Sequence, residues 1–62
     1  MFRITANYDD RRHPLQGDVR TVASVAEAMA VVEDCECDLN ELLPGDRCDA
    51  WGFGVEYIVE RI

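Results

Sequence analysis

The chain has 62 residues, of which 13 are Asp or Glu and six are Arg, so it carries a formal net charge of −7 without any lysine. A chain this short hides only about 60% of its unfolded surface in one small core, which leaves no room for a two-lobed active-site cleft. The negative charge disfavours direct binding to phosphate backbones and to anionic membranes, so we expect basic or neutral partners.

The N-terminal third of the chain predicts one strand and a long loop. Residues 1–8 alternate apolar and polar side chains, which is the pattern of a half-buried strand. Residues 9–18 hold a single large apolar residue, Leu15, and predict a loop. The segment Val19–Val22 fits either a short second strand or the approach to a helix, and the sequence leaves both open.

Two stretches in the middle of the chain carry helix-start signals followed by apolar residues at helical spacing. Ser24 and Glu27 have the spacing of a capping box, so we expect a first helix from about Val25 to about Asp34. Asp38 repeats this arrangement with the glutamate three residues later, and Pro44 stops the segment. We therefore expect a second helix of one or two turns.

The C-terminal part predicts a hairpin. Residues 47–51 and 55–62 have strand character, and Gly52 and Gly54 permit the positive φ of a tight connection. The predicted order is strand, helix, helix, strand, strand. This order gives one two-layer α+β domain, in which two short helices cover a three-stranded antiparallel sheet.

The charge is concentrated in the expected helical segment. Residues 21–46 contain seven carboxylates and no Lys or Arg, whereas the flanking segments nearly cancel internally. This pattern fits a solvated surface that only confers solubility, and it also fits a contact surface for a basic partner. We favour the second interpretation because Glu33 and Asp34 fall in the expected last turn of the first helix, where the helix dipole disfavours anions by about 0.3–1 kcal/mol each. The predicted partner-binding residues, led by Glu33, Asp34 and Glu36, are Glu27, Glu33, Asp34, Glu36, Asp38, Glu41 and Asp46.

Apolar anchors are needed beside such charges, because exposed ion pairs contribute only about 0–1 kcal/mol each. Trp51, Phe53 and Tyr57 are candidates, although the aromatic residues of so small a domain usually belong to the core. The charges would then mainly accelerate the encounter and select the partner.

The cysteines offer little support for a metal site. Cys35 and Cys37 form a C-x-C pair, with Cys48 and His13 as further possible zinc ligands, but zinc knuckles space their paired cysteines by two or more residues. We expect no metal and no other cofactor. We also expect free, reduced thiols in the cytosol, a structural one at Cys48, and thiol pKa values raised by acidic neighbours. No nucleophile elbow or phosphate loop is present, so we expect a protein that is not an enzyme.

The single α+β domain, the absence of lysine and the acidic series Glu33, Asp34, Glu36, Asp38 and Glu41 resemble the small acidic inhibitors encoded by phages. The resemblance is to the anti-CRISPR proteins that act on type I surveillance complexes. The resemblance extends over the whole chain, but it is one of general character, and no sequence motif is shared. It implies an inhibitor in the bacterial cytoplasm that mimics nucleic acid and occupies the DNA-binding site of a basic partner. The Arg residues of the 9–18 loop depart from a purely acidic mimic.

An alternative function remains open at this point. The chain also fits a non-catalytic adaptor, antitoxin or subunit that docks through its C-terminal hairpin and a sheet edge. In both cases we expect a monomer or weak dimer that binds neither nucleic acid nor membranes directly.

Overall fold

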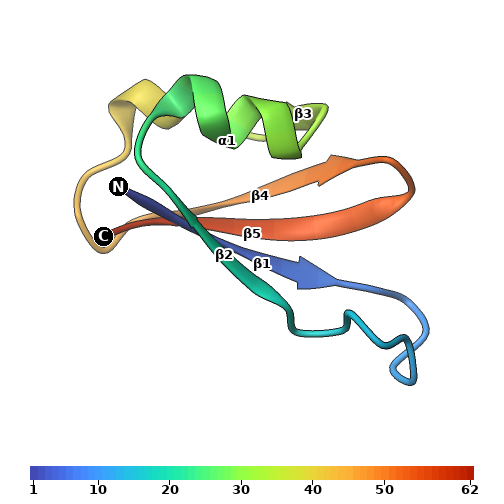
Figure 1. Ribbon diagram of the computed structural model, residues 1–62. Helices are drawn as coiled ribbons and strands as arrows, with labels where there is room; N and C mark the ends of the chain where they lie inside the picture. Colours follow the sequence, from blue (N-terminus) through green and yellow to red (C-terminus); the bar gives the residue numbers. More distant parts are fainter.

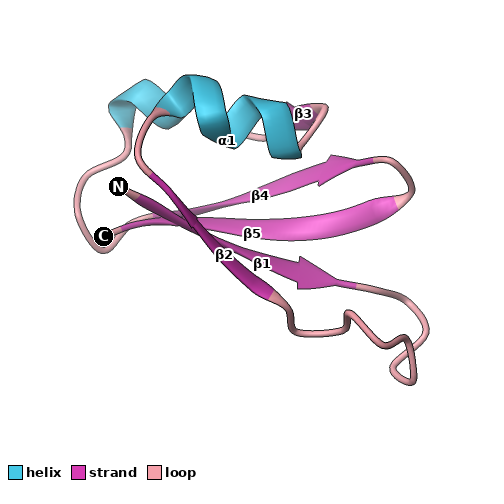
Figure 2. Cartoon of the chain, in the orientation of Figure 1, coloured by secondary structure: helices cyan, strands magenta, loops and turns pink.

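The computed structural model describes all 62 residues as a small α+β domain, with one helix and a 3-10 turn packed on one face of an antiparallel sheet (Figures 1 and 2). The α+β class is therefore confirmed, but the sheet has five strands where three were expected, in the spatial order β2-β1-β5-β4-β3. The elements are β1 (Phe2–Asn7), β2 (Val19–Val22), α1 (Val25–Val31), β3 (Asp34–Cys35), the 3-10 turn (Leu39–Glu41), β4 (Arg47–Gly52) and β5 (Val55–Arg61).

The N-terminal strand forms where the alternation predicts it, and it lies between β2 and β5. Val19–Val22, which the sequence left open, is a strand because its residues pair antiparallel with β1. The loop between these strands is confirmed, and the ladder runs on into it: the Ala6 N–H donates to the Asp18 carbonyl at 2.9 Å. Both ends of the loop are thereby held to the sheet.

The first helix begins as predicted but ends earlier. The Ser24 hydroxyl accepts a hydrogen bond from the Glu27 N–H at 3.2 Å, so the N-cap is confirmed. The helix stops at Val31 instead of Asp34, because the Glu33 N–H donates to the Trp51 carbonyl and the chain continues as a strand beside β4. Glu33 and Asp34 are thus outside the helix, and the helix-dipole argument for them was wrong.

The second expected helix is only a single 3-10 turn. Asp38 caps it, but its carboxylate accepts from the Asn40 N–H at 2.9 Å, so there is no capping box with Glu41. Leu39 and Leu42 are buried in this segment and pin it over the sheet. Burial of two leucines explains why one turn is enough to cover this end of the core.

The core lies between the sheet and the helical layer. Alternate residues of β1 and β4, together with Val59 on β5, are buried beneath the helical layer, and no charged or polar residue is buried among them. The opposite face of the sheet is not covered by any helix (Figure 1). The buried cluster is Phe2, Ile4, Val22, Ala28, Val32, Leu39, Leu42, Cys48, Ala50 and Val59.

The predicted C-terminal hairpin is confirmed, with Phe53 and Gly54 as its two turn residues. Their φ values are 55° and 77°, the left-handed pair of a type I′ turn. Gly52 has a separate role, because a Cβ at this position would lie 2.5 Å from the Glu33 backbone nitrogen. A glycine is therefore required where the chain after α1 crosses the hairpin.

The cysteines differ from expectation. Cys37 and Cys48 form a disulfide, so the prediction of free, reduced thiols is wrong for these two residues, and the cytosolic compartment that it supported stays a prediction. Cys35 keeps a thiol, whose pKa is raised by burial and by the Asp34 and Asp38 carboxylates. The disulfide also removes two of the four residues considered as zinc ligands. The helix α1 has seven residues, far fewer than a helix needs to span a bilayer.

Candidate partner-binding face

The uncovered face of the sheet carries alternate residues of each strand, and one of its ends is ion-paired. Arg3 on β1 and Arg47 on β4 both lie opposite Glu60 on β5. The Arg3 Nη1 atom is 3.2 Å from the Glu60 Oε1 atom. At this end each anionic side chain has cationic neighbours across the strands, which is the ordinary stabilising pattern of an exposed sheet.

The other end of the same face has no cation. Trp51 on β4 lies directly between Asp34 on β3 and Glu56 on β5 in the strand register. Cross-strand neighbours of this kind have Cβ atoms about 4.5–5.5 Å apart. In the next row, Asp49 lies beside Glu36, whose N–H donates to the Asp49 carbonyl at 2.8 Å. Four acidic residues therefore occupy the strand positions next to Trp51 and in the adjoining row.

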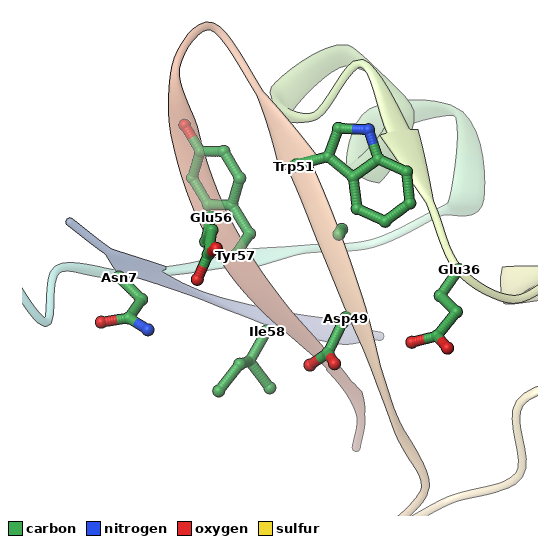
Figure 3. A pocket seen from close by; sticks show the side chains of 8 residues that line it. Asn7, Glu36, Asp49, Trp51, Glu56, Tyr57 and Ile58 are labelled. Atoms are coloured by element: carbon green, nitrogen blue, oxygen red, sulfur yellow. The ribbon is translucent and has the colours of Figure 1, made fainter. Parts of the chain in front are cut away.

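Two open hollows meet at this indole. The first, of about 380 Å³, is lined by Glu36, Asp49, Glu56, Ile58 and the indole itself, among others. Figure 3 shows the indole above the side chains of Ile58, Asp49 and Glu36. The second hollow, of about 590 Å³, runs around the hairpin turn and shares Trp51 and Glu56 with the first. Neither hollow is lined by any Arg. We call the carboxylates of both hollows, with their two exposed aromatic residues, the acidic hairpin end: Asp9, Glu33, Asp34, Glu36, Asp49, Glu56, Trp51 and Phe53.

The two aromatic residues are held toward solvent. The side chain of Trp51 is 45% exposed and that of Phe53 is 70% exposed, whereas Tyr57 packs against the core. Phe53 also occupies a left-handed turn position at which Asn or Gly is preferred. Neither burial nor turn propensity explains a phenylalanine there, and its side chain stays exposed to solvent.

Backbone contacts fix the acidic hairpin end. The Glu33 carboxylate accepts from the Phe53 N–H at 2.5 Å, and the Glu33 N–H donates to the Trp51 carbonyl at 3.0 Å. The disulfide between Cys37 and Cys48 ties the same segment to β4 a few residues further on. The carboxylates therefore sit on a braced scaffold, which limits the conformational entropy that binding would cost.

The structure brings together only some of the seven residues predicted from sequence. Glu33, Asp34 and Glu36 lie at the acidic hairpin end. The others lie elsewhere: one at the start of α1, and three in and around the 3-10 turn and the loop that leads into β4. Three of these accept a hydrogen bond from a nearby backbone N–H, as the carboxylates of Glu33 and Asp34 also do, so position and not hydrogen bonding separates the two groups. The separated residues are Glu27, Asp38 and Asp46, which have such a bond, and Glu41, which has none.

Sequence reasoning missed Asp9, Asp49 and Glu56, because each belongs to a segment whose charges nearly cancel. Strand alternation was the signal that could have found the last two. In a strand, residues an even number apart share a face, which groups Asp49 with Trp51 on one strand of the hairpin.

A comparison of the chain with protein-family models, curated proteins and solved structures finds no match.

Proposed function

We propose that the protein is a non-catalytic inhibitor whose acidic hairpin end docks on a basic nucleic-acid-binding surface of another protein and keeps nucleic acid out of it. One observation carries the proposal: six carboxylates line two adjoining hollows around two exposed aromatic side chains, and no Arg lies among them. The only ion pair of the chain is at the other end of the sheet.

The arrangement suits a cationic groove. Fixed negative charges steer a positively charged partner and raise the association rate, while contributing little lasting affinity by themselves. Trp51 and Phe53 supply the lasting affinity, because buried aromatic side chains dominate the affinity of protein interfaces. A groove lined with Arg and Lys that accepts a phosphate backbone accepts such a carboxylate series equally well.

The resemblance to anti-CRISPR inhibitors suggests the first partner to test, which is the DNA-recognition subunit of a type I surveillance complex. In this role the protein would occupy the DNA-binding site without any catalytic step. If this subunit does not bind, affinity capture from a bacterial lysate at low and high salt identifies the basic protein to use instead.

The second candidate function is an adaptor, antitoxin or subunit that docks through the hairpin. The exposure of Phe53 at the hairpin tip favours this function, because an apolar side chain binds in an uncharged pocket of a partner as well as in a basic groove. The two functions differ in salt dependence. Docking on a basic groove weakens steeply as salt screens the charges, whereas apolar docking is nearly insensitive to salt.

The test compares two double variants of equal net charge. Glu36→Lys with Glu56→Lys reverses two charges at the acidic hairpin end, and Asp18→Lys with Glu41→Lys reverses two exposed charges outside it. A gel-shift competition measures how well each variant displaces DNA from the partner. We expect at least a tenfold loss for the first variant and little change for the second. Equal losses would show that only net charge matters and would defeat the assignment of the site.

A further inference from the structure

We infer that the hollow beside Trp51 is a subsite for an arginine side chain of the partner, whose guanidinium stacks on the indole between flanking carboxylates. The inference rests on the proposed function and specifies the group that the acidic hairpin end selects. It starts from the register, in which Glu56 is a cross-strand neighbour of Trp51, and from the hollow of about 380 Å³, which Glu56 and Asp49 line together with the indole.

The first step concerns the kind of cation. The structure gathers no three His, Cys, Asp or Glu residues close enough to hold a metal ion. Instead, three acidic residues, Glu36, Asp49 and Glu56, line a hollow of about 380 Å³ together with the half-exposed Trp51. Carboxylates spread around a π-face match a large organic cation, because such a cation meets the ring with its face and the carboxylates with its edges.

The second step separates arginine from lysine. The guanidinium group is planar and weakly hydrated, stacks on aromatic rings, and presents a fork of N–H donors that matches a carboxylate. The ammonium group of lysine is compact and strongly hydrated, so it gains less from the indole. Trp51, Glu56 and Asp49 all line the hollow, so it offers both the stacking surface and the acceptors that a guanidinium uses.

The third step concerns the aliphatic stem of the arginine. Ile58 lines the same hollow and is only partly covered by the chain itself. The methylene groups of an arginine lie readily along such an apolar surface while the charged head stays at the carboxylates. Ile58 and Trp51 therefore provide the apolar surface for the stem, and the carboxylates of the same hollow accept hydrogen bonds from the charged head.

The experiment uses hexa-arginine, hexa-lysine and hexa-citrulline peptides with blocked ends, titrated into the full chain. Trp51 is the only tryptophan, so its fluorescence reports directly on the hollow. We expect hexa-arginine to bind roughly two- to fivefold more tightly than hexa-lysine, the size of one exposed cation–π contact, and hexa-citrulline not to bind. Equal affinities for the two cationic peptides would overturn the subsite.

Variants make the result specific to the hollow. In Trp51→Leu, followed by calorimetry because the fluorophore is lost, the two cationic peptides should bind equally; a preference for arginine that persists there would contradict the inference. Glu56→Gln keeps the indole and should reduce the preference, while Glu41→Gln, outside the hollow, should leave it unchanged. Equal binding of both peptides by the unmodified chain, together with intact competition against DNA, would remove the subsite and leave the proposed function standing.

Discussion

The two ends of the uncovered sheet face are built by the same strands, but acidic side chains have cationic neighbours at one end only. At one end Glu60 lies between Arg3 and Arg47, and an ion pair forms. At the other end Trp51 lies between two acidic residues in the register, and no Arg lines the hollows beside it. Folding of the sheet does not require unopposed charge, because the first end shows how the same strands neutralise it. The second end is the one that we propose contacts a partner.

The largest expected effect comes from the disulfide, which ties the segment that carries Glu33, Asp34 and Glu36 to β4. Cys37 and Cys48 are 11 residues apart, and a loop of this size predicts a loss of roughly 3 kcal/mol of unfolding free energy when the bond is removed. Chemical denaturation of Cys37→Ala with Cys48→Ala measures it. The control is Cys35→Ala, which should unfold like the unmodified chain and remain sensitive to reductant. A double variant as stable as the unmodified chain would mean that the disulfide does not stabilise the fold.

Gly52→Ala should have the next largest effect, because its Cβ would meet the Glu33 backbone nitrogen. We expect a destabilisation of about 1–3 kcal/mol, typical of overpacking, together with weaker binding as the segment bearing Glu33 shifts away from the hairpin. Thermal unfolding and the DNA competition assay measure the two consequences. Unchanged stability would show that the crossing of this segment over the hairpin is loose.

Phe53→Asn should separate stability from binding. Asn suits the left-handed turn position better than Phe, so we expect stability to rise by about 0.5–1 kcal/mol. Binding should weaken, because the most exposed aromatic side chain of the acidic hairpin end is lost. A loss of stability would show instead that Phe53 supports the fold.

How far the sequence predicted this molecule depends on the range of the interaction. The first strand, the Ser24 cap and the C-terminal hairpin follow from local patterns, and all three are present. The short strand β3 and the disulfide were missed, because each depends on a partner in β4 that lies distant in the chain. Non-local pairing of this kind leaves almost no trace in the periodicity of a two-residue strand.

The candidate site shows the same limit. Counted by segments, Asp49 and Glu56 looked balanced by Arg47 and Arg61. In the structure Arg47 lies in the row of the ion-paired end, and Arg61 donates a hydrogen bond to the Leu42 carbonyl. Neither arginine lines the hollows beside the indole. Charge balance along the chain is therefore a poor guide to charge balance on a sheet face, where alternation and register decide which charges meet.

The smallest expected effect contrasts the two ends directly. Glu60→Gln removes the partner of Arg3 and should lower stability by about 0.2–1 kcal/mol, the usual size of an exposed ion pair. Glu56→Gln removes a carboxylate with no cation nearby and should leave stability unchanged or slightly higher. Denaturation curves at low and high salt measure both. Equal losses for the two variants would erase the distinction between the ends.

An amide NMR titration of the isotopically labelled chain with hexa-arginine at low salt tests directly whether the acidic hairpin end is the surface that binds a cationic partner. We expect the shift changes to concentrate in residues 33–36 and 49–57, around Trp51, and to leave Arg3, Arg47 and Glu60 nearly unmoved. Shift changes spread evenly over all exposed carboxylates, or centred on the 3-10 turn around Asp38 and Glu41, would contradict it.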